Sequence, residues 1–163
     1  MRYCILFLAI SSLLFSATQS DRSKILTAVS GEWIAQGLYT AVKLDVATHL
    51  IKGSKHIEEL ANLTHSNEES LYRLMRLLAG EGIFKEEENR FFSNTKSSEL
   101  LAENHPQSIK QLILFYAEEM SKSFHQLLPC IKEGKPAFEL EFHTPVSIIS
   151  KIIPLLENLS MLQ

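Results

Sequence analysis

The stretch that decides the fold is "SNEESLYRLMRLLAGEGIFKEEENRFFSN", residues 66–94. Ser66 and Glu69 stand at the spacing of a capping box, the pair of side chains that satisfies free backbone N–H groups at the start of a helix. Behind them, apolar residues recur at intervals of three and four, which predicts an amphipathic helix. Its predicted buried side chains are Leu71, Leu74, Met75 and Leu78.

A glycine stop and a hairpin follow this helix. Gly80 or Gly82 can end it, because glycine tolerates the left-handed conformation of a helix C-cap. The sequence "IFKEEENRFFSN" then predicts two short strands around a turn at Glu88–Asn89. Upstream, the apolar stripe of "HIEELANL" predicts a shorter helix. The order helix, tight turn, helix, hairpin predicts a mainly α domain that contains a winged helix-turn-helix with a small β-hairpin wing.

Many winged helices bind DNA, but the charge of this one opposes that function. Residues 54–93 carry five Lys or Arg and eight Glu, a net charge of −3. Glu68 and Glu69 begin the predicted second helix, and the hairpin tip is "KEEEN". The electrostatic attraction to phosphate that dominates DNA affinity would here be a repulsion. We expect a packing module that binds no nucleic acid; a DNA-binding regulator that uses Arg73 and Arg76 is the disfavoured alternative.

The segment before residue 53 has the pattern of a helix that is apolar around much of its circumference. In "SKILTAVSGEWIAQGLYTAVKLDVATHLI" apolar residues fall on more than one face, and Gly31 and Gly37 interrupt the pattern. A helix of this kind must be buried on more than one side. From the pattern alone, a partner subunit and the chain's own domain are equal candidates to cover it.

The first 20 residues, "MRYCILFLAISSLLFSATQS", differ from the rest. A single positive charge, a short apolar run and small residues at the end are typical of a secretory signal peptide cut before Asp21. The apolar run is too short for a stable membrane span. A buried N-terminal helix and a start site assigned too far upstream are the alternatives. If the signal is real, the protein is exported.

The C-terminal third is also helical by pattern. Pro106 can open a helix, since its missing N–H costs nothing at that position, and Pro129 predicts a kink in the helix that follows. Thr144 and Pro145 can cap and start a last helix in the very apolar segment that ends the chain. We expect that segment to leave hydrophobic surface that something must cover.

The sequence contains no pattern that indicates catalysis. None of the six histidines lies in a HExxH pair or beside a cysteine at zinc spacing, so we expect neither a metal site nor a catalytic residue. No β–α–β alternation and no glycine-rich loop are present, so we expect no cofactor-binding residues in this chain. Once a signal is removed Cys130 is the one remaining cysteine, and we expect it to be a small buried hydrophobe.

Three blocks together resemble the N-terminal region of S-adenosylmethionine-dependent O-methyltransferases of the caffeic-acid, acetylserotonin and hydroxyneurosporene type. They are "GEWIAQGLYTAVKLDVATHLIKGSKHIEELA", "ESLYRLMRLLAGEGIFKEEENRFFSNTKSSELL" and "HPQSIKQLILFYAEEMSKSFHQLLPCIKEGKPAFE". The likeness runs from about Lys24 to Glu139, and "LYRLMRLLAGEGIF" is its most specific part.

The resemblance implies an intertwined homodimer in which this region also forms one wall of the substrate pocket. The implied dimer residues are Trp33, Ile34, Leu38, Tyr39, Val42 and Val46. The implied pocket-wall residues are Phe115, Met120 and Phe124. Because dimerisation needs doubly apolar first helices, the resemblance favours a partner subunit as their cover.

The chain also departs from the family. Its resemblance stops after Phe142, before the glycine-rich cofactor loop and the catalytic histidine that the family carries. His56 replaces a Thr-like N-cap and His65 replaces a turn glycine, and we expect both changes to cost local stability. The expected organisation is an apolar segment at residues 1–20, a methyltransferase-type dimerisation domain at 21–142 and an apolar helix at 143–163.

Three functions follow from this sequence. The favoured one is a dimerisation module from a truncated methyltransferase, inactive alone. The second is a non-catalytic, pocket-lining subunit of a split methyltransferase, in which S-adenosylmethionine enters only with a separate catalytic chain. The third is the DNA-binding regulator. The family resemblance favours the cytoplasm, whereas the apolar start favours export.

Overall fold

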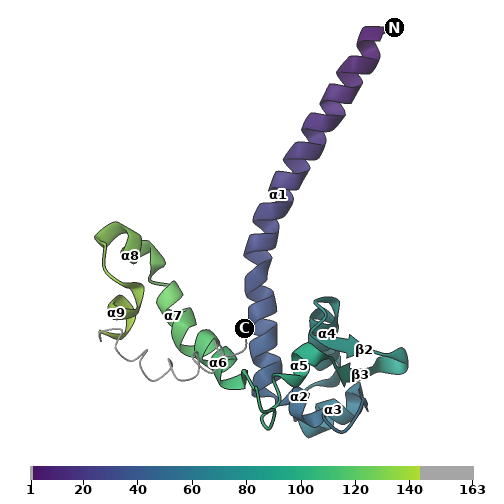
Figure 1. The fold of residues 1–163 in the computed structure, drawn as a ribbon, viewed down its shortest axis with the longest axis vertical. Coiled ribbons are helices and arrows are strands. Elements are labelled where there is room, and N and C mark those ends of the chain that lie inside the picture. Colours follow the sequence, from purple (N-terminus) through teal and green to yellow (C-terminus); the bar gives the residue numbers. More distant parts are fainter. Residues whose placement is uncertain (1, 144–163) are drawn as a thin grey trace. The chain divides into compact units, whose positions relative to one another are not determined.

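The computed structural model describes the backbone of residues 2–143 and the side chains of residues 21–143. It divides into two units that meet between Ala35 and Gln36. The first unit is the N-terminal part of α1, a helix that runs from Arg2 to Lys43 (Figure 1). Gly31 and Gly37 interrupt the apolar pattern of the sequence but not the helix, because α1 passes through both. The helix also runs through the predicted boundary at residues 20–21, where cleavage stays a prediction.

The second unit begins with the C-terminal part of α1, and short helices and strands follow it. Around the chain they lie in the order α2 (Val46–His49), β1 (Lys55–His56), α3 (Ile57–Leu63), α4 (Glu68–Gly80), β2 (Phe84–Glu86), η1 (Glu88–Arg90), β3 (Phe91–Asn94) and α5 (Lys96–Glu99). The predicted mainly α fold with a small β wing is confirmed. In Figure 1 the strands lie beside α3 and α4.

The three strands form one antiparallel sheet in the order β1-β3-β2. Phe84 pairs with Asn94 and Glu86 with Phe92, which fixes the register of the predicted hairpin. Its tip turns through Asn89 and Arg90, both with positive φ, the conformation in which asparagine is one of the tolerated residues. The two-residue strand β1, which pairs with Phe91 and Phe92, is absent from the sequence-based prediction.

The core lies where α1, α3, α4 and the sheet meet. Of the four predicted core side chains of α4, three are buried and Leu74 is half-buried. The largest fully buried side chains are Phe84, Phe92, Ile57, Leu60, Met75, Leu78 and Val46. Burial of each of these side chains away from water stabilises the fold by about 1.5–3 kcal/mol.

The helix caps differ in part from the prediction. The N-cap of α4 is Asn67, whose side chain accepts the N–H of Ser70 at 3.0 Å, so the predicted Ser66/Glu69 capping box is wrong. His56 does cap α3, and its Nδ1 accepts the N–H of Glu58 at 3.3 Å, which offsets the expected loss. His65 adopts the expected left-handed conformation at φ 52°.

Five short helices complete the described chain: α6 (Lys110–Phe115), the π-helical η2 (Tyr116–Met120), α7 (Ser121–Phe124), α8 (Leu127–Glu133) and α9 (Ala137–Phe142). The predicted helix start at Pro106 is wrong, because turns occupy residues 106–107 and α6 begins at Lys110. Pro129 lies in the first turn of α8, where its missing N–H costs nothing, and the chain bends just before that helix. The helix predicted from Thr144 and Pro145 lies outside the described residues.

Candidate interaction surface

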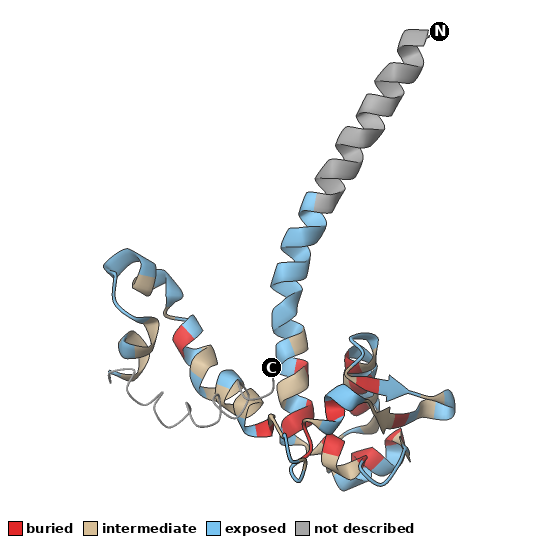
Figure 2. Ribbon diagram, viewed as in Figure 1, coloured by how far each residue is buried: buried red, intermediate tan, exposed pale blue. Residues whose placement is uncertain are grey.

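The first unit exposes an apolar stripe along α1. Ile25, Leu26, Val29 and Trp33 recur at intervals of three and four, so they share one face of the helix. Each is at least 66% exposed, and Trp33 reaches 77%. Figure 2 shows this part of α1 as a continuous pale-blue, exposed run. We call these four residues the α1 stripe; a shallow hollow lined by Leu26, Val29 and Trp33 lies on it.

Further along α1 and at the start of α2, the remaining predicted interface residues become progressively buried. Ile34, Leu38 and Tyr39 are half-buried. Val42 and Val46 are only 3% and 0% exposed, because they belong to the core of the chain itself. The sequence pattern left two candidate covers for the helix, and within the second unit the chain's own domain covers this part of it.

A close contact explains one of the glycines in α1. A Cβ on Gly37 would lie 3.3 Å from a Leu74 methyl carbon and 3.4 Å from one of Leu77. The missing side chain therefore lets α1 approach α4 closely. Gly31 has no atom within 4 Å of such a Cβ, so no close contact requires glycine there.

A polar cluster joins α1 to η2. The hydroxyl of Tyr39 and the ammonium of Lys43 both donate to Oε1 of Glu118, at 2.9 and 3.1 Å. These hydrogen bonds, first from Lys43 and then from Tyr39, lower the pKa of Glu118. The same contact with Glu118 raises the pKa of Tyr39 and of Lys43.

A second polar cluster, not predicted from the sequence, holds the start of α6. The ammonium of Lys110, 8% exposed as a residue, donates to Asp45 at 2.5 Å and also to Glu103. Burial alone would lower the pKa of Lys110, but the two carboxylates raise it above its ordinary value. Asp45 has a left-handed backbone at the end of α1, and this turn aims its carboxylate at Lys110.

The predicted pocket-wall residues follow one another along α6, η2 and α7. Phe115 and Met120 are half-buried, and the Phe115 ring packs edge-on to Tyr116 at 6.0 Å. Phe124 at the end of α7 is exposed. Their role in a substrate pocket stays a prediction.

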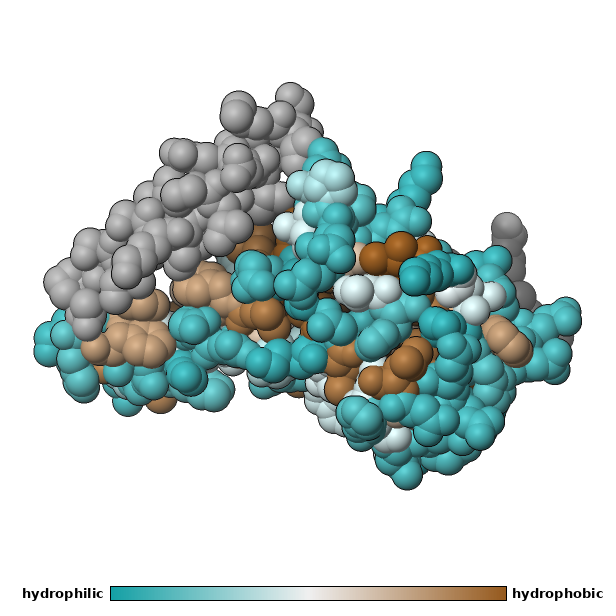
Figure 3. Space-filling view, turned by 90° about the horizontal axis from the view of Figure 1, so that it is seen from below, coloured by the Kyte–Doolittle hydropathy of each residue, from teal (hydrophilic) through white to brown (hydrophobic). Residues whose placement is uncertain are grey.

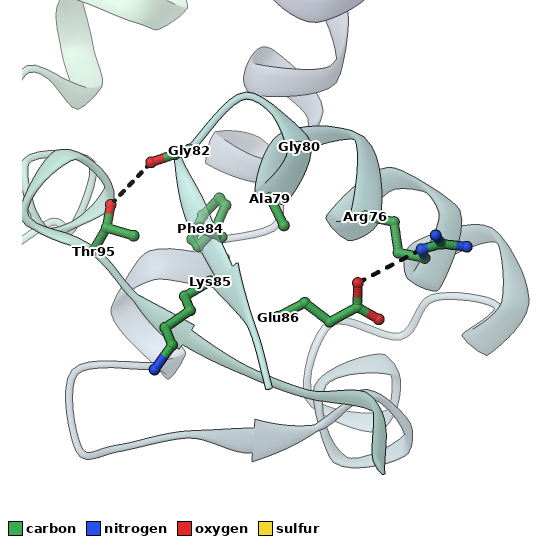
Figure 4. Close-up of a pocket in the computed structure, with 8 residues that line it drawn as sticks. All are labelled: Arg76, Ala79, Gly80, Gly82, Phe84, Lys85, Glu86 and Thr95. Atoms are coloured by element: carbon green, nitrogen blue, oxygen red, sulfur yellow. Dashed lines mark hydrogen bonds and ion pairs between the residues drawn. The ribbon is translucent and has the colours of Figure 1, made fainter. Parts of the chain in front are cut away.

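A separate hollow lies between α4 and the wing (Figure 4). Its floor is Phe84, Ala79 and the glycines at 80 and 82. Arg76 points toward Glu86, with 3.5 Å between Nε and Oε2, and the Thr95 hydroxyl donates to the carbonyl of Ile83 at 2.6 Å. These polar groups of the hollow are thus paired with other groups of the same chain.

The tip of the wing is likewise paired within the chain. Arg90 donates to Glu69 at 2.7 Å and to Glu68 at 3.3 Å, and its guanidinium stacks over Tyr72 at 4.2 Å. The hydrogen bond from Arg90 lowers the pKa of Glu69. Arg73, which the sequence names together with Arg76 as a candidate for DNA contact, donates to Ser70 at 3.3 Å.

The small sheet of the described residues differs from the doubly wound sheet that binds S-adenosylmethionine, and the expectation of no cofactor-binding residues in this chain stays a prediction. A doubly wound methyl-donor site needs a parallel strand, a glycine-rich loop and a helix in succession. The sheet among residues 2–143 is antiparallel instead. The described part of the chain also holds no cluster of three His, Cys, Asp or Glu able to bind a metal ion. Nor does any helix there combine the length and apolar character that crossing a membrane requires.

Known proteins share both the sequence and the fold of this chain. The O-methyltransferase dimerisation domain model matches residues 26–104. A phenazine O-methyltransferase of Lysobacter antibioticus is 34% identical over 122 residues, 75% of this chain and 36% of that protein. A phenazine-1-carboxylate N-methyltransferase of Pseudomonas aeruginosa is 33% identical over 72% of this chain and 35% of its own length.

A solved structure agrees with these matches. The pyocyanin biosynthetic protein PhzM superposes with a TM-score of 0.75 at 29% identity, over 86% of this chain and 42% of that one. The chain thus spans a little over a third of the length of the curated relatives it matches. On sequence and fold together, residues 26–104 belong to the O-methyltransferase dimerisation domain family.

Proposed function

We propose that the chain is a self-association module that forms a homodimer through the α1 stripe. The single observation that carries this proposal is the exposure of Ile25, Leu26, Val29 and Trp33 on one face of α1. Monomeric proteins rarely leave a contiguous apolar face of this kind in water. The stripe begins beside the first residue of the matched dimerisation domain and continues into it.

The composition of the stripe suits a protein interface. Tryptophan is enriched among the residues that dominate binding energy, and Trp33 lies among three aliphatic side chains. The charged neighbours Asp21 and Lys24 pair with each other at 3.4 Å and can form a polar rim. A second copy of the same helix would supply a matching apolar face, as a two-fold interface requires.

Sedimentation velocity on the full chain tests the proposal. We expect a concentration-dependent species of twice the mass of one chain, which Val29→Glu weakens by about 30-fold or more, the effect of losing about 2 kcal/mol at an interface. Ala35→Glu is the matched control, since position 35 is exposed, lies outside the stripe and is about 120° from Val29 around α1. A monomer at every concentration, or equal weakening by both variants, contradicts the proposal.

A second function rests on the observation that the chain matches only 35–36% of the length of the curated relatives. In it, the chain supplies Phe115, Met120 and Phe124 to a pocket whose methyl donor is bound by a separate catalytic chain. Titration calorimetry against a methyltransferase catalytic domain tests it. Binding that Met120→Asp removes supports this function, and no heat on mixing rejects it.

Ion pairs within the chain engage arginines that a DNA-binding protein would use to contact phosphate, and this supports a role in protein association alone. In the helix-turn-helix and wing, Arg90 and Arg76 each face glutamates, so few cations are free to meet phosphate. We propose that the chain does not bind nucleic acid. A mobility shift on double-stranded DNA at low salt that Arg73→Ala and Arg76→Ala abolish would overturn this.

A further inference from the structure

The second unit exposes an apolar surface of its own, far along the sequence from the α1 stripe. Phe124 ends α7, and Leu127, Leu128 and Ile131 follow on α8. Their exposed fractions run from 55% for Leu127 to 75% for Ile131. We call these four residues the α8 stripe. Figure 3 shows hydrophobic residues, in brown, breaking the hydrophilic surface on the face that it draws.

The chain returns to the neighbourhood of the α8 stripe just before the described residues end. Helix α9 packs against both α7 and α8. The side-chain amide of Gln126, at the N-cap position of α8, donates to Glu141 of α9 at 2.9 Å. The α9 helix ends at Phe142. The described residues therefore end just after a helix that packs against α8.

Residues 144–163 have the composition of a segment whose apolar side chains must be buried against another surface. Half of the 20 residues 144–163 are Val, Ile, Leu or Met, and Lys151 and Glu157 are the only charged ones. Ile148, Ile149, Ile152 and Ile153 stand at positions i, i+1, i+4 and i+5. This spacing is typical of the apolar face of an amphipathic helix.

We propose that the α8 stripe is the docking surface for the chain's own residues 144–163. Docking removes two apolar surfaces from water at once, which is favourable in proportion to the apolar area buried. The short tether gives the segment an effective concentration of about millimolar, which a second copy at micromolar concentration does not match. The tethered segment also avoids the loss of translational freedom that a separate partner must offset.

Thiol labelling of the full chain tests this docking. Cys4→Ser and Cys130→Ser remove the two natural thiols. Ile131→Cys then places a reporter in the α8 stripe, with Leu128→Cys as an independent second reporter. Glu133→Cys is the matched control, since it is exposed and lies about half a turn from Ile131 around α8. Each reporter is made with the natural segment, and again with Ile148, Ile149, Ile152 and Ile153 changed to Ser.

With the natural segment, we expect Ellman's reagent to label the stripe thiols at least about tenfold more slowly than the thiol at 133, because labelling requires the segment to open. The four Ser substitutions should remove this difference, and the rates should not depend on protein concentration. Equal rates with the natural segment overturn the proposal. Protection that grows with protein concentration and survives the four substitutions also overturns it, and assigns the stripe to a second copy.

Discussion

The Tyr39 hydroxyl donates a 2.9 Å hydrogen bond to Glu118, 79 residues further along the chain. Lys43, one helical turn after Tyr39, shares the same carboxylate oxygen. One carboxylate of the π-helical segment therefore holds two side chains of α1. The contact joins the helix that enters the dimerisation domain to the helices that leave it.

Glu118→Gln should weaken this contact in a pH-dependent way. The pKa of Glu118 is lowered, so its charge stabilises the fold above the ordinary glutamate pKa, and this contribution is lost as the pH falls through the lowered value. We expect the variant to be less stable than the natural chain at about pH 7 and closer to it at about pH 3, because protonation of the carboxylate in acid removes the advantage of its charge. Denaturant unfolding at both pH values measures this. Glu119→Gln, a change at the exposed neighbour, should show no such convergence.

Lys110→Met should destabilise the second unit by about 1–2 kcal/mol, because it leaves the carboxylates of Asp45 and Glu103 without their cation. The pKa of Lys110 is raised, so its contribution is present below the ordinary lysine pKa and disappears as the pH rises through the raised value. Urea unfolding near neutral pH measures the loss. Lys52→Met at an exposed position is the control, and an equal effect of both changes would show that the cluster adds nothing.

Gly37→Leu should destabilise the fold by about 1–3 kcal/mol, the usual cost of forcing extra volume into a packed contact. Its side chain would meet Leu74 and Leu77, which already lie 3.3–3.4 Å from the Cβ position. Gly31→Leu is the matched change in open space and should be neutral or stabilising, since leucine favours a helix more than glycine does. Thermal unfolding of the two variants compares them. A similar change in both variants would mean that the contact with α4 does not set the effect.

Asn67→Ala should cost about 1 kcal/mol, the usual value of an N-cap side chain. Its Oδ1 accepts the N–H of Ser70 at the start of α4. Ser66→Ala should cost less, because that hydroxyl contacts Thr64 rather than the helix start. Chemical denaturation distinguishes the two variants, and a larger loss from Ser66→Ala would restore the capping box expected from the sequence.

The local parts of this fold could be predicted from the sequence, because they follow from spacing. The period of apolar residues located α3 and α4, and Glu88–Asn89 located the hairpin turn. Strand β1 could not be predicted, since two residues carry no periodicity and become a strand only by pairing with β3. The start of α6 was missed because Pro106 suits a turn as well as a first helical position.

The candidate surface could be predicted only in part. The pattern of α1 showed that more than one face is apolar, but it could not tell the face with Val42, buried in the core, from the face with Trp33. The contacts of Glu118 with α1 and of Lys110 with Asp45 join residues 65 to 79 positions apart, and a single sequence contains no signal for such pairs. The reason for Gly37 could not be predicted, because a close helix contact leaves no mark on the sequence except the missing side chain.

The fluorescence of Trp33, the single tryptophan of the chain, tests the proposed homodimer most directly. In one copy its side chain is 77% exposed, so a monomer should emit at long wavelength. The account predicts emission at shorter wavelength in the concentrated protein and a shift to longer wavelength on dilution, with the same midpoint as the change in mass. Long-wavelength emission that stays the same at every concentration would contradict it.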